Sequence, residues 1–145
     1  MSDVDHSAQL AHLFNRLREP VFRSAIQALR FPQGSRGLDA GCGAGLQALL
    51  LAEAVGPAGH ITGLDLSSEL LARAEDMVKK AGLSERISFR EGDVNDLPFD
   101  DDTFDWAWSV DLGGYAPIEP LPLVKELARV VKPGGSVAFL AWSSE

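Results

Sequence analysis

The chain has 145 residues, of which 46% are hydrophobic and 23% are charged, and its net charge is −8. This length supports one domain with a hydrophobic core, and the negative charge argues against a large nucleic-acid-binding face, which is normally basic. The single cysteine, Cys42, excludes an internal disulfide framework and is typical of a reducing compartment. No apolar run is long enough to cross a membrane, and the acidic, polar N-terminus does not resemble a signal peptide, so the sequence predicts a cytoplasmic protein.

The N-terminal segment has the periodicity of helices. Apolar residues recur at helical spacing through residues 3 to 30, and Pro20 interrupts the pattern. Because proline lacks a backbone N–H and disfavours a helix interior, we expect two helices rather than one. A turn-forming cluster then separates this segment from the rest. The sequence therefore predicts a helical cap over residues 1–34 and a main domain over residues 35–145.

In the main domain, short apolar strands alternate with helices. The pattern predicts strands at residues 37–40, 61–65, 86–93, 104–110 and 136–142, and helices at residues 46–55, 67–82 and 119–131. Such alternation is typical of βαβ units with right-handed crossovers. We therefore expect an α/β fold, with a doubly wound, mostly parallel Rossmann-like sheet and helices on both faces. Ligands of such sheets bind at the carboxyl ends of the strands.

A glycine-rich turn lies at one of these strand ends. It has the sequence LDAGCGAGL, residues 38–46, and joins the first strand to the next helix. Gly41 and Gly43 remove side chains where the backbone must turn sharply and approach a ligand, and the helix behind them points free N–H groups at the same place. The turn can hold a phosphate, a carboxylate or a sugar, or it can simply be a tight turn with no ligand.

Three acidic residues, Asp39, Asp65 and Asp93, stand at the ends of three successive predicted strands. Asp65 follows Gly45 by about twenty residues, a spacing typical of an acid that accepts the hydroxyls of a ribose. It could also stabilise the N-terminus of the next helix. Asp93 can accept a hydrogen bond from the amino group of adenine while the backbone N–H of Val94 donates to a ring nitrogen, or it can cap a turn. Together the three acids favour a nucleoside site.

Five segments carry a resemblance to a known family. LDAGCGAG, GLDLS, GDVNDLPF, FDWAWSV and RVVKPGG, in this order and spacing, resemble class I methyltransferases that use S-adenosylmethionine. The resemblance is strongest to the small-molecule branch that includes quinone-biosynthesis C-methyltransferases, and it spans roughly residues 35–141. It implies transfer of a methyl group from S-adenosylmethionine to a small-molecule acceptor.

The resemblance also implies which residues bind the cofactor. The glycine turn and the acid before it would face the methionine part. The acid at the end of the second strand would bind the ribose, and the leucine after it and the loop after the third strand would contact the adenine. Backbone at the end of the fourth strand would line the sulfonium. The implied cofactor-binding residues are Asp39, Gly41, Cys42, Gly43, Asp65, Leu66, Asp93, Val94 and Ser109.

Catalytic residues are not identified by the sequence. An activated methyl group mainly requires alignment, and a base is needed only if the acceptor must lose a proton. Asp111 and Tyr115 follow the fourth strand and are candidates for the acceptor side, as is His12 in the cap, which could instead face solvent. We interpret Cys42 as a small residue near the ligand rather than as a nucleophile, because no His, Asp or Glu stands near it at the spacing of a catalytic triad or a metal site.

Two alternatives remain open at this point. The family's sheet normally has seven strands and ends in an antiparallel hairpin, whereas this chain stops after the fifth predicted strand. One alternative is therefore a truncated cofactor-binding module without activity of its own, and the exposed edge of the fifth strand could self-associate or pair with a partner chain. The other alternative is an NAD(P)-dependent oxidoreductase, whose fingerprint is G-x-G-x-x-G. Here the glycines run G-x-G-x-G after Asp39, whose carboxylate would repel a pyrophosphate and attract the ammonium of a methionine.

Nucleic-acid substrates are disfavoured by the turn after the fourth strand. Enzymes of this fold that methylate the amino groups of nucleic acids have an N-P-P-Y-like sequence at this turn. The corresponding sequence in this chain is SVDLGGY.

Overall fold

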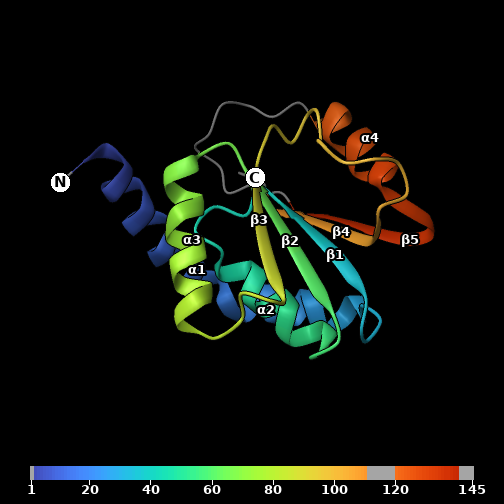
Figure 1. The fold of residues 1–145 in the computed structure, drawn as a ribbon, viewed down its shortest axis with the longest axis horizontal. Coiled ribbons are helices and arrows are strands. Elements are labelled where there is room, and N and C mark those ends of the chain that lie inside the picture. Colours follow the sequence, from blue (N-terminus) through green and yellow to red (C-terminus); the bar gives the residue numbers. More distant parts are fainter. Residues whose placement is uncertain (1, 111–119, 141–145) are drawn as a thin grey trace.

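A computed structural model describes residues 2–110 and 120–140. The helices are α1 (Asp3–Leu29), α2 (Leu46–Val55), α3 (Ser68–Lys80) and α4 (Pro120–Val130), and the strands are β1 (Arg36–Ala40), β2 (His60–Asp65), β3 (Ile87–Glu91), β4 (Phe104–Val110) and β5 (Val131–Leu140). The strands form one sheet in the order β3-β2-β1-β4-β5, and every neighbouring pair is parallel. The predicted α/β Rossmann-like fold is confirmed (Figure 1).

The strand order reverses between β1 and β4. The chain moves outward from β1 through β2 to β3 and then returns to place β4 on the other side of β1. In open α/β sheets, such a reversal opens a crevice outside the carboxyl ends of the strands. The topology therefore directs attention to the edge where β1, β2 and β4 end.

Two hydrophobic cores sandwich the sheet. One includes residues of α1, α2 and α3, with Trp106 and Trp108 from β4, and the other includes residues of α4, with Leu38 from β1 and Leu64 from β2. Side chains of a parallel strand alternate between the two faces, so both faces of the central strands are covered. Trp106 and Trp108 are both fully buried in the first of these cores.

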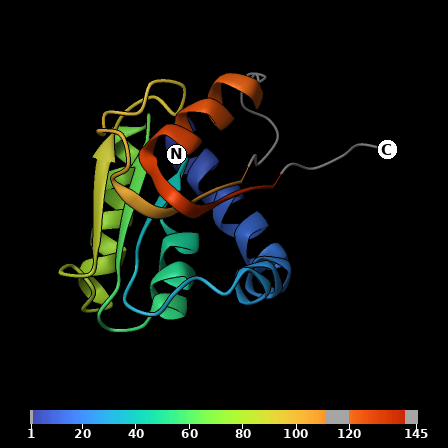
Figure 2. The ribbon, with the colours of Figure 1, turned by 90° about the vertical axis from the view of Figure 1, so that its right-hand side faces the viewer.

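Pro20 does not divide the N-terminal segment, and the prediction of two helices is wrong. A single helix, α1, runs from Asp3 to Leu29 with Pro20 inside it. Proline removes one backbone hydrogen bond from a helix. The second half of α1 nevertheless lies beside α2 (Figure 2), and its Phe22 and Ile26 are buried in the core. This packing stabilises the second half of α1, so the helix continues past Pro20.

Strand β5 begins earlier than predicted, at Val131, but its ladder is interrupted. Phe104 pairs with Val131 and Trp106 with Ser136, so the intervening KPGG segment lies outside the pairing. Gly134 has a φ of +84°, which glycine adopts easily. The KPGG segment, residues 132–135, therefore forms an interruption within β5. The predicted strand end at residues 141–142 lies outside the described residues.

None of the helices within residues 2–110 and 120–140 combines the length and apolar character that a membrane-spanning segment needs.

Candidate functional site

The carboxyl ends of the parallel strands lie side by side, and we call this end of the sheet its carboxyl edge. It brings together the acids that the sequence analysis identified. Asp39 lies near the end of β1, Asp65 is the last residue of β2, and Asp93 follows β3 closely. Ser109 pairs with Ala40 at the end of β1. Because the strands are parallel, these residues share one edge of the sheet (Figure 1).

The glycine turn is held from one side and open on the other. The N–H groups of Gly41 and Cys42 both donate to the carbonyl oxygen of Leu64, at 2.7 and 2.9 Å. Gly41 and Gly43 have φ values of +80° and +53°, and a Cβ atom added at either would meet nothing within 4 Å. The turn therefore leaves open space where a ligand could approach the backbone.

Gly45, the third glycine of the turn, has a different role. A Cβ atom there would come within 3.0 Å of the Cβ atom of Ala74 and 3.2 Å of the Cε atom of Met77, both on α3. Gly45 is also the N-cap of α2, with a φ of +90°. It therefore allows α2 and α3 to pack closely behind the turn.

Asp65 supports both the turn and the start of α3. Its Oδ2 accepts a hydrogen bond from the N–H of Gly43 at 2.9 Å, and its Oδ1 accepts one from the N–H of Ser67 at 3.0 Å. Ser67 in turn caps α3 by accepting from the N–H of Leu70. Since each carboxylate oxygen has two lone pairs, the side chain can still accept hydrogen bonds from a ligand. The two sequence-based interpretations of Asp65 are thus compatible, but its bond to Gly43 was missed.

Asp39 is a buried acid with an open oxygen. Its side chain is 1% exposed, and its Oδ2 has no hydrogen-bond partner within the part of the chain that the structure describes. Burial, and secondly the charge of Asp65, raise the pKa of Asp39 to about 8. Such a group is stabilised by a cationic or hydrogen-bond-donating partner. Asp39 thus marks a place at this edge where a positively charged group would be favoured.

Cys42 is a packing residue in this geometry. Its Sγ lies against Gly63 of β2, where a Cβ atom would come within 2.9 Å of the sulfur. Burial, followed by the charges of Asp39 and Asp65, raises the pKa of the Cys42 thiol. The thiol therefore stays protonated, which agrees with the interpretation that it is not a nucleophile.

The remaining predicted cofactor-binding residues also lie at the carboxyl edge. Some of their side chains are already hydrogen-bonded within the protein, and one is exposed. The hydroxyl of Ser109 donates to the carbonyl oxygen of Ala40 at 2.8 Å, so its side chain joins β4 to β1 and only its backbone can face a ligand. Oδ1 of Asp93 accepts from the N–H of Asn95 at 2.9 Å, which closes a turn. Leu66 is 66% exposed and is available for contact.

The candidates for the acceptor side are not placed. Asp111 and Tyr115 lie outside the described residues, and His12 lies within α1 but its side chain is also outside them. No group of three His, Cys, Asp or Glu side chains that could hold a metal ion occurs in residues 2–110 and 120–140.

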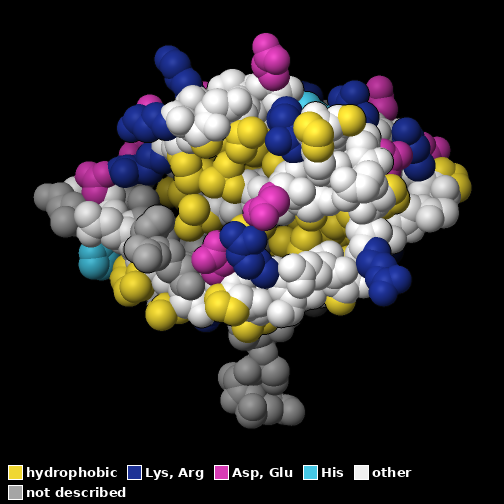
Figure 3. Space-filling view, turned by 90° about the horizontal axis from the view of Figure 1, so that it is seen from below, with side chains coloured by type: hydrophobic (Ala, Val, Ile, Leu, Met, Phe, Trp, Pro, Cys, Tyr) yellow, Lys and Arg dark blue, Asp and Glu magenta, His cyan; other side chains and the backbone are white. Residues whose placement is uncertain are grey.

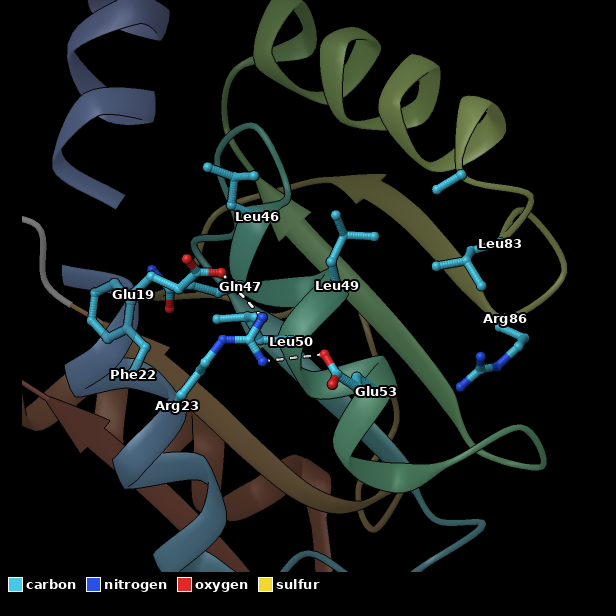
Figure 4. A pocket seen from close by; sticks show the side chains of 11 residues that line it. Glu19, Phe22, Arg23, Leu46, Gln47, Leu49, Leu50, Glu53, Leu83 and Arg86 are labelled. Carbon is cyan, nitrogen blue, oxygen red and sulfur yellow. Dashed lines mark hydrogen bonds and ion pairs between the residues drawn. The ribbon is translucent and has the colours of Figure 1, made fainter. Parts of the chain in front are cut away.

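A separate groove runs along the outer side of α2. Its volume is about 600 Å³, and it is lined by Phe22 and Arg23 of α1, by leucines of α2 such as Leu50, and by the connection between α3 and β3 (Figure 4). Hydrophobic side chains are exposed on the face of the molecule that carries α1 and α2 (Figure 3). None of the strand-end acids lines this groove. The sequence did not predict this groove, whose lining combines leucines with the charged residues Glu19, Arg23, Glu53 and Arg86.

Known proteins resemble this chain in sequence and in structure. A family model described as a methyltransferase domain matches residues 38–135. The demethylmenaquinone methyltransferase of Bacillus subtilis is 39% identical over 118 residues, which cover 81% of this chain and 50% of the relative. The chain spans about half the length of the curated relatives it matches.

Solved structures show the same fold. A SAM dependent methyltransferase from Aquifex aeolicus has a TM-score of 0.75 and 28% identity, covering 86% of this chain and 65% of its own. The [4+2]-cyclase SpnF has a TM-score of 0.69 and 36% identity, covering 79% of this chain and 42% of its own. One structure with this fold is thus named for a cyclase reaction rather than for methyl transfer.

Proposed function

The chain belongs to the methyltransferase-domain family, and on this premise we propose that it binds S-adenosylmethionine at the carboxyl edge of its sheet and transfers the methyl group to a small-molecule acceptor. The observation that carries the proposal is the open turn at Gly41 and Gly43, together with the Oδ2 of Asp39, which has no hydrogen-bond partner among residues 2–110 and 120–140. Together they form a cradle for a positively charged ligand.

The charge of the cradle fits this cofactor better than a dinucleotide. Two carboxyl groups, those of Asp39 and Asp65, flank the glycine turn. The methionine part of S-adenosylmethionine carries an ammonium and a sulfonium, which carboxylates attract. A pyrophosphate would instead meet negative charge, which argues against an NAD(P)-dependent oxidoreductase.

The other residues at the edge would hold the nucleoside. Asp65 retains acceptor capacity for the ribose hydroxyls, Leu66 is exposed for contact with the adenine, and Asp93 and Val94 lie on the loop that would face the edge of the base. The backbone of Ser109 would line the sulfonium. S-adenosylmethionine supplies a methyl group that is already activated, so the chain's contribution is to bind, orient and align.

A second candidate is binding of the cofactor without methyl transfer by this chain alone. The similarity to the [4+2]-cyclase SpnF favours keeping it, because that relative's name describes a different reaction. The chain also spans about half the length of the curated relatives it matches, and the candidates for the acceptor side that follow β4 in the sequence, Asp111 and Tyr115, lie outside the described residues.

Further proposals concern the setting of the site. We propose that residues 1–34 form a cap on the domain of residues 35–145, that the protein works in the cytoplasm, and that β5 can pair with a further chain. The packing of Phe22 in the same core as the sheet supports the first. The position of β5 at the edge of the described sheet supports the last.

Calorimetric titration with S-adenosylhomocysteine tests the proposed binding. We expect the chain to bind this product of methyl transfer and Asp65→Ala to weaken binding by about 1.5–3 kcal/mol, because a charge-assisted contact is lost. Because Asp65 also holds Gly43 and Ser67, the folded state of the variant must be checked by circular dichroism. Asp76→Ala, which removes an exposed acid paired with Lys80 on α3, is the matched control and should bind normally.

Two outcomes would count against the proposal. A folded wild-type chain that binds no S-adenosylhomocysteine, or that binds NADH in preference, would exclude the assigned cofactor. If the chain does bind S-adenosylhomocysteine, transfer of a tritiated methyl group to a metabolite extract separates the two candidates, since only methyl transfer by this chain predicts labelled product.

A further inference from the structure

The loop between β3 and β4 carries the residues proposed to read the adenine. It leaves the sheet after Glu91, and its first residue, Gly92, donates its N–H to the carbonyl oxygen of Asp65 at 3.0 Å. Asp93 then closes a short turn, with its Oδ1 bonded to the N–H of Asn95 and its carbonyl oxygen bonded to the N–H of Asp96. The start of the loop is thus tied to the proposed ribose site.

Two side chains of α4 hold the next part of this loop. The N–H of Leu97 donates to Oε1 of Glu126 at 2.8 Å, and the carbonyl oxygen of Leu97 accepts from Nη2 of Arg129 at 2.9 Å. Nη1 of Arg129 also donates to the carbonyl oxygen of Phe99 at 2.8 Å. Both backbone polar groups of Leu97 are therefore bonded by this pair, much as a neighbouring strand would bond them.

The Glu126–Arg129 pair is itself fixed. Nε of Arg129 donates to Oε2 of Glu126 at 2.6 Å, and the two residues are one turn apart on α4. The helix is anchored in the core by Leu123 and Leu127, which are fully buried. The side chain of Leu97 is buried in the same core. The loop therefore meets a rigid partner at this point.

The guanidinium of Arg129 is suited to this task in a way that a lysine is not. It donates to the carbonyl oxygens of Leu97 and Phe99 and to the carboxylate of Glu126 at the same time. Its donors point in fixed directions from a planar group, whereas an ammonium is a compact charge on a flexible stem. Replacement by lysine would keep the charge and lose the geometry.

We propose that Glu126 and Arg129 are positioning residues for base recognition: by fixing Leu97 they set the direction in which Asp93 and Val94 face the adenine. The inference rests on the proposed cofactor site. The methionine and ribose parts would be held by β1 and β2, which the pair does not touch. Loosening the loop should therefore weaken discrimination between bases more than it weakens the rest of the binding.

The test compares two ligands that differ only at the base. S-adenosylhomocysteine has the adenine amino group, and S-inosylhomocysteine has a carbonyl oxygen in its place. We expect the wild-type chain to prefer the adenosyl ligand at least tenfold by calorimetry. In Arg129→Lys the preference should fall below threefold. Arg129 bridges two acids, Glu126 and Asp101. Arg23→Lys is the matched control, because Arg23 likewise bridges two acids, Glu19 and Glu53, but at the groove beside α2.

The ratio of the two affinities separates positioning from mere stability. A purely structural role for Arg129 would lower both affinities by the same factor, and an unchanged ratio in Arg129→Lys would overturn the inference. Should that variant not fold, Glu126→Gln keeps an oxygen for the N–H of Leu97, loses the charge that holds Arg129, and should lower the ratio in the same direction. Equal wild-type affinity for both ligands would overturn the inference and leave the cofactor site standing. Binding of neither ligand would count against the proposed function itself.

Discussion

The core beneath α1 and α2 and the carboxyl edge of the sheet both bury polar side chains, but they treat them differently. In the core, Nε1 of Trp106 donates to Oγ of Ser35 at 2.8 Å and Nε1 of Trp108 donates to Oε1 of Gln47 at 2.7 Å. At the edge, Asp39 is buried to the same degree, yet its Oδ2 has no partner in the described part of the chain. Buried polar groups are normally bonded, so the open oxygen points to a ligand rather than to stability.

The glycines of the two regions differ in the same way. At Gly37, in the middle of the sheet, an added Cβ atom would clash with the ring of Trp106. At Gly41 and Gly43 it would meet nothing. The absence of a side chain makes room for the protein's own core in one region and leaves open space in the other. The core around Trp106 is thus filled by the protein's own side chains, whereas the carboxyl edge leaves space for another molecule.

The largest expected change in stability comes from Trp106→Ala, which tests how tightly the core is packed. Trp106 is fully buried, and its ring stacks on Phe31 with centroids 3.9 Å apart. Removing it should leave a cavity and lower the free energy of unfolding by about 3–5 kcal/mol. Urea denaturation measures this change. A loss below about 1 kcal/mol would show that the core is less tightly packed than described, whereas Trp106→Phe should retain most of the packing.

The pH dependence of the free energy of unfolding tests the burial of Asp39 at the carboxyl edge. The pKa of Asp39 is about 8 in the folded state against an ordinary value of 3.8, so between these values the folded state binds one proton more than the unfolded state. The contribution of Asp39 to stability therefore falls as pH rises through this window, by about 1.4 kcal/mol per pH unit. Urea denaturation from pH 5 to 7 should show this fall in the wild-type chain relative to Asp39→Asn. Parallel curves for the two proteins would contradict it.

The smallest expected change in stability comes from a pair of glycine substitutions. Gly41 and Gly82 have similar φ values, +80° and +72°, and an added Cβ atom would meet nothing at either. Alanine at each should therefore cost a similar free energy, about 1–2 kcal/mol, from the left-handed backbone alone. Only Gly41→Ala should also weaken binding of S-adenosylhomocysteine, because only there is the open space part of the proposed site. Equal binding by the two variants would remove the turn from the site.

The fold and the positions of the strand-end acids could be predicted because they follow from local patterns. Alternating strands and helices predict a parallel sheet, and the carboxyl ends of parallel strands share an edge, so Asp39, Asp65 and Asp93 had to meet there. The continuity of α1 through Pro20 could not be predicted, because it depends on packing against α2 that periodicity does not reveal.

The connections within the site were also beyond the sequence. The bond between Gly43 and Asp65 joins residues 22 positions apart, and that between Leu97 and Glu126 joins residues 29 positions apart. No local pattern marks such pairs. The spacing of Glu126 and Arg129 on one helix face was a visible signal of an ion pair, but nothing in it indicated the loop that the pair would hold.

The turn after β1 has one more consequence, which concerns entropy. Its N–H groups are already bonded to Leu64 and to Asp65, and β1 lies in the middle of the sheet with a strand on each side. A ligand that arrives there meets backbone whose conformational freedom was given up during folding. Ordering a flexible loop at the moment of association weakens binding, and this turn avoids that loss. The edge is thus incomplete in its contacts but preorganised in its shape.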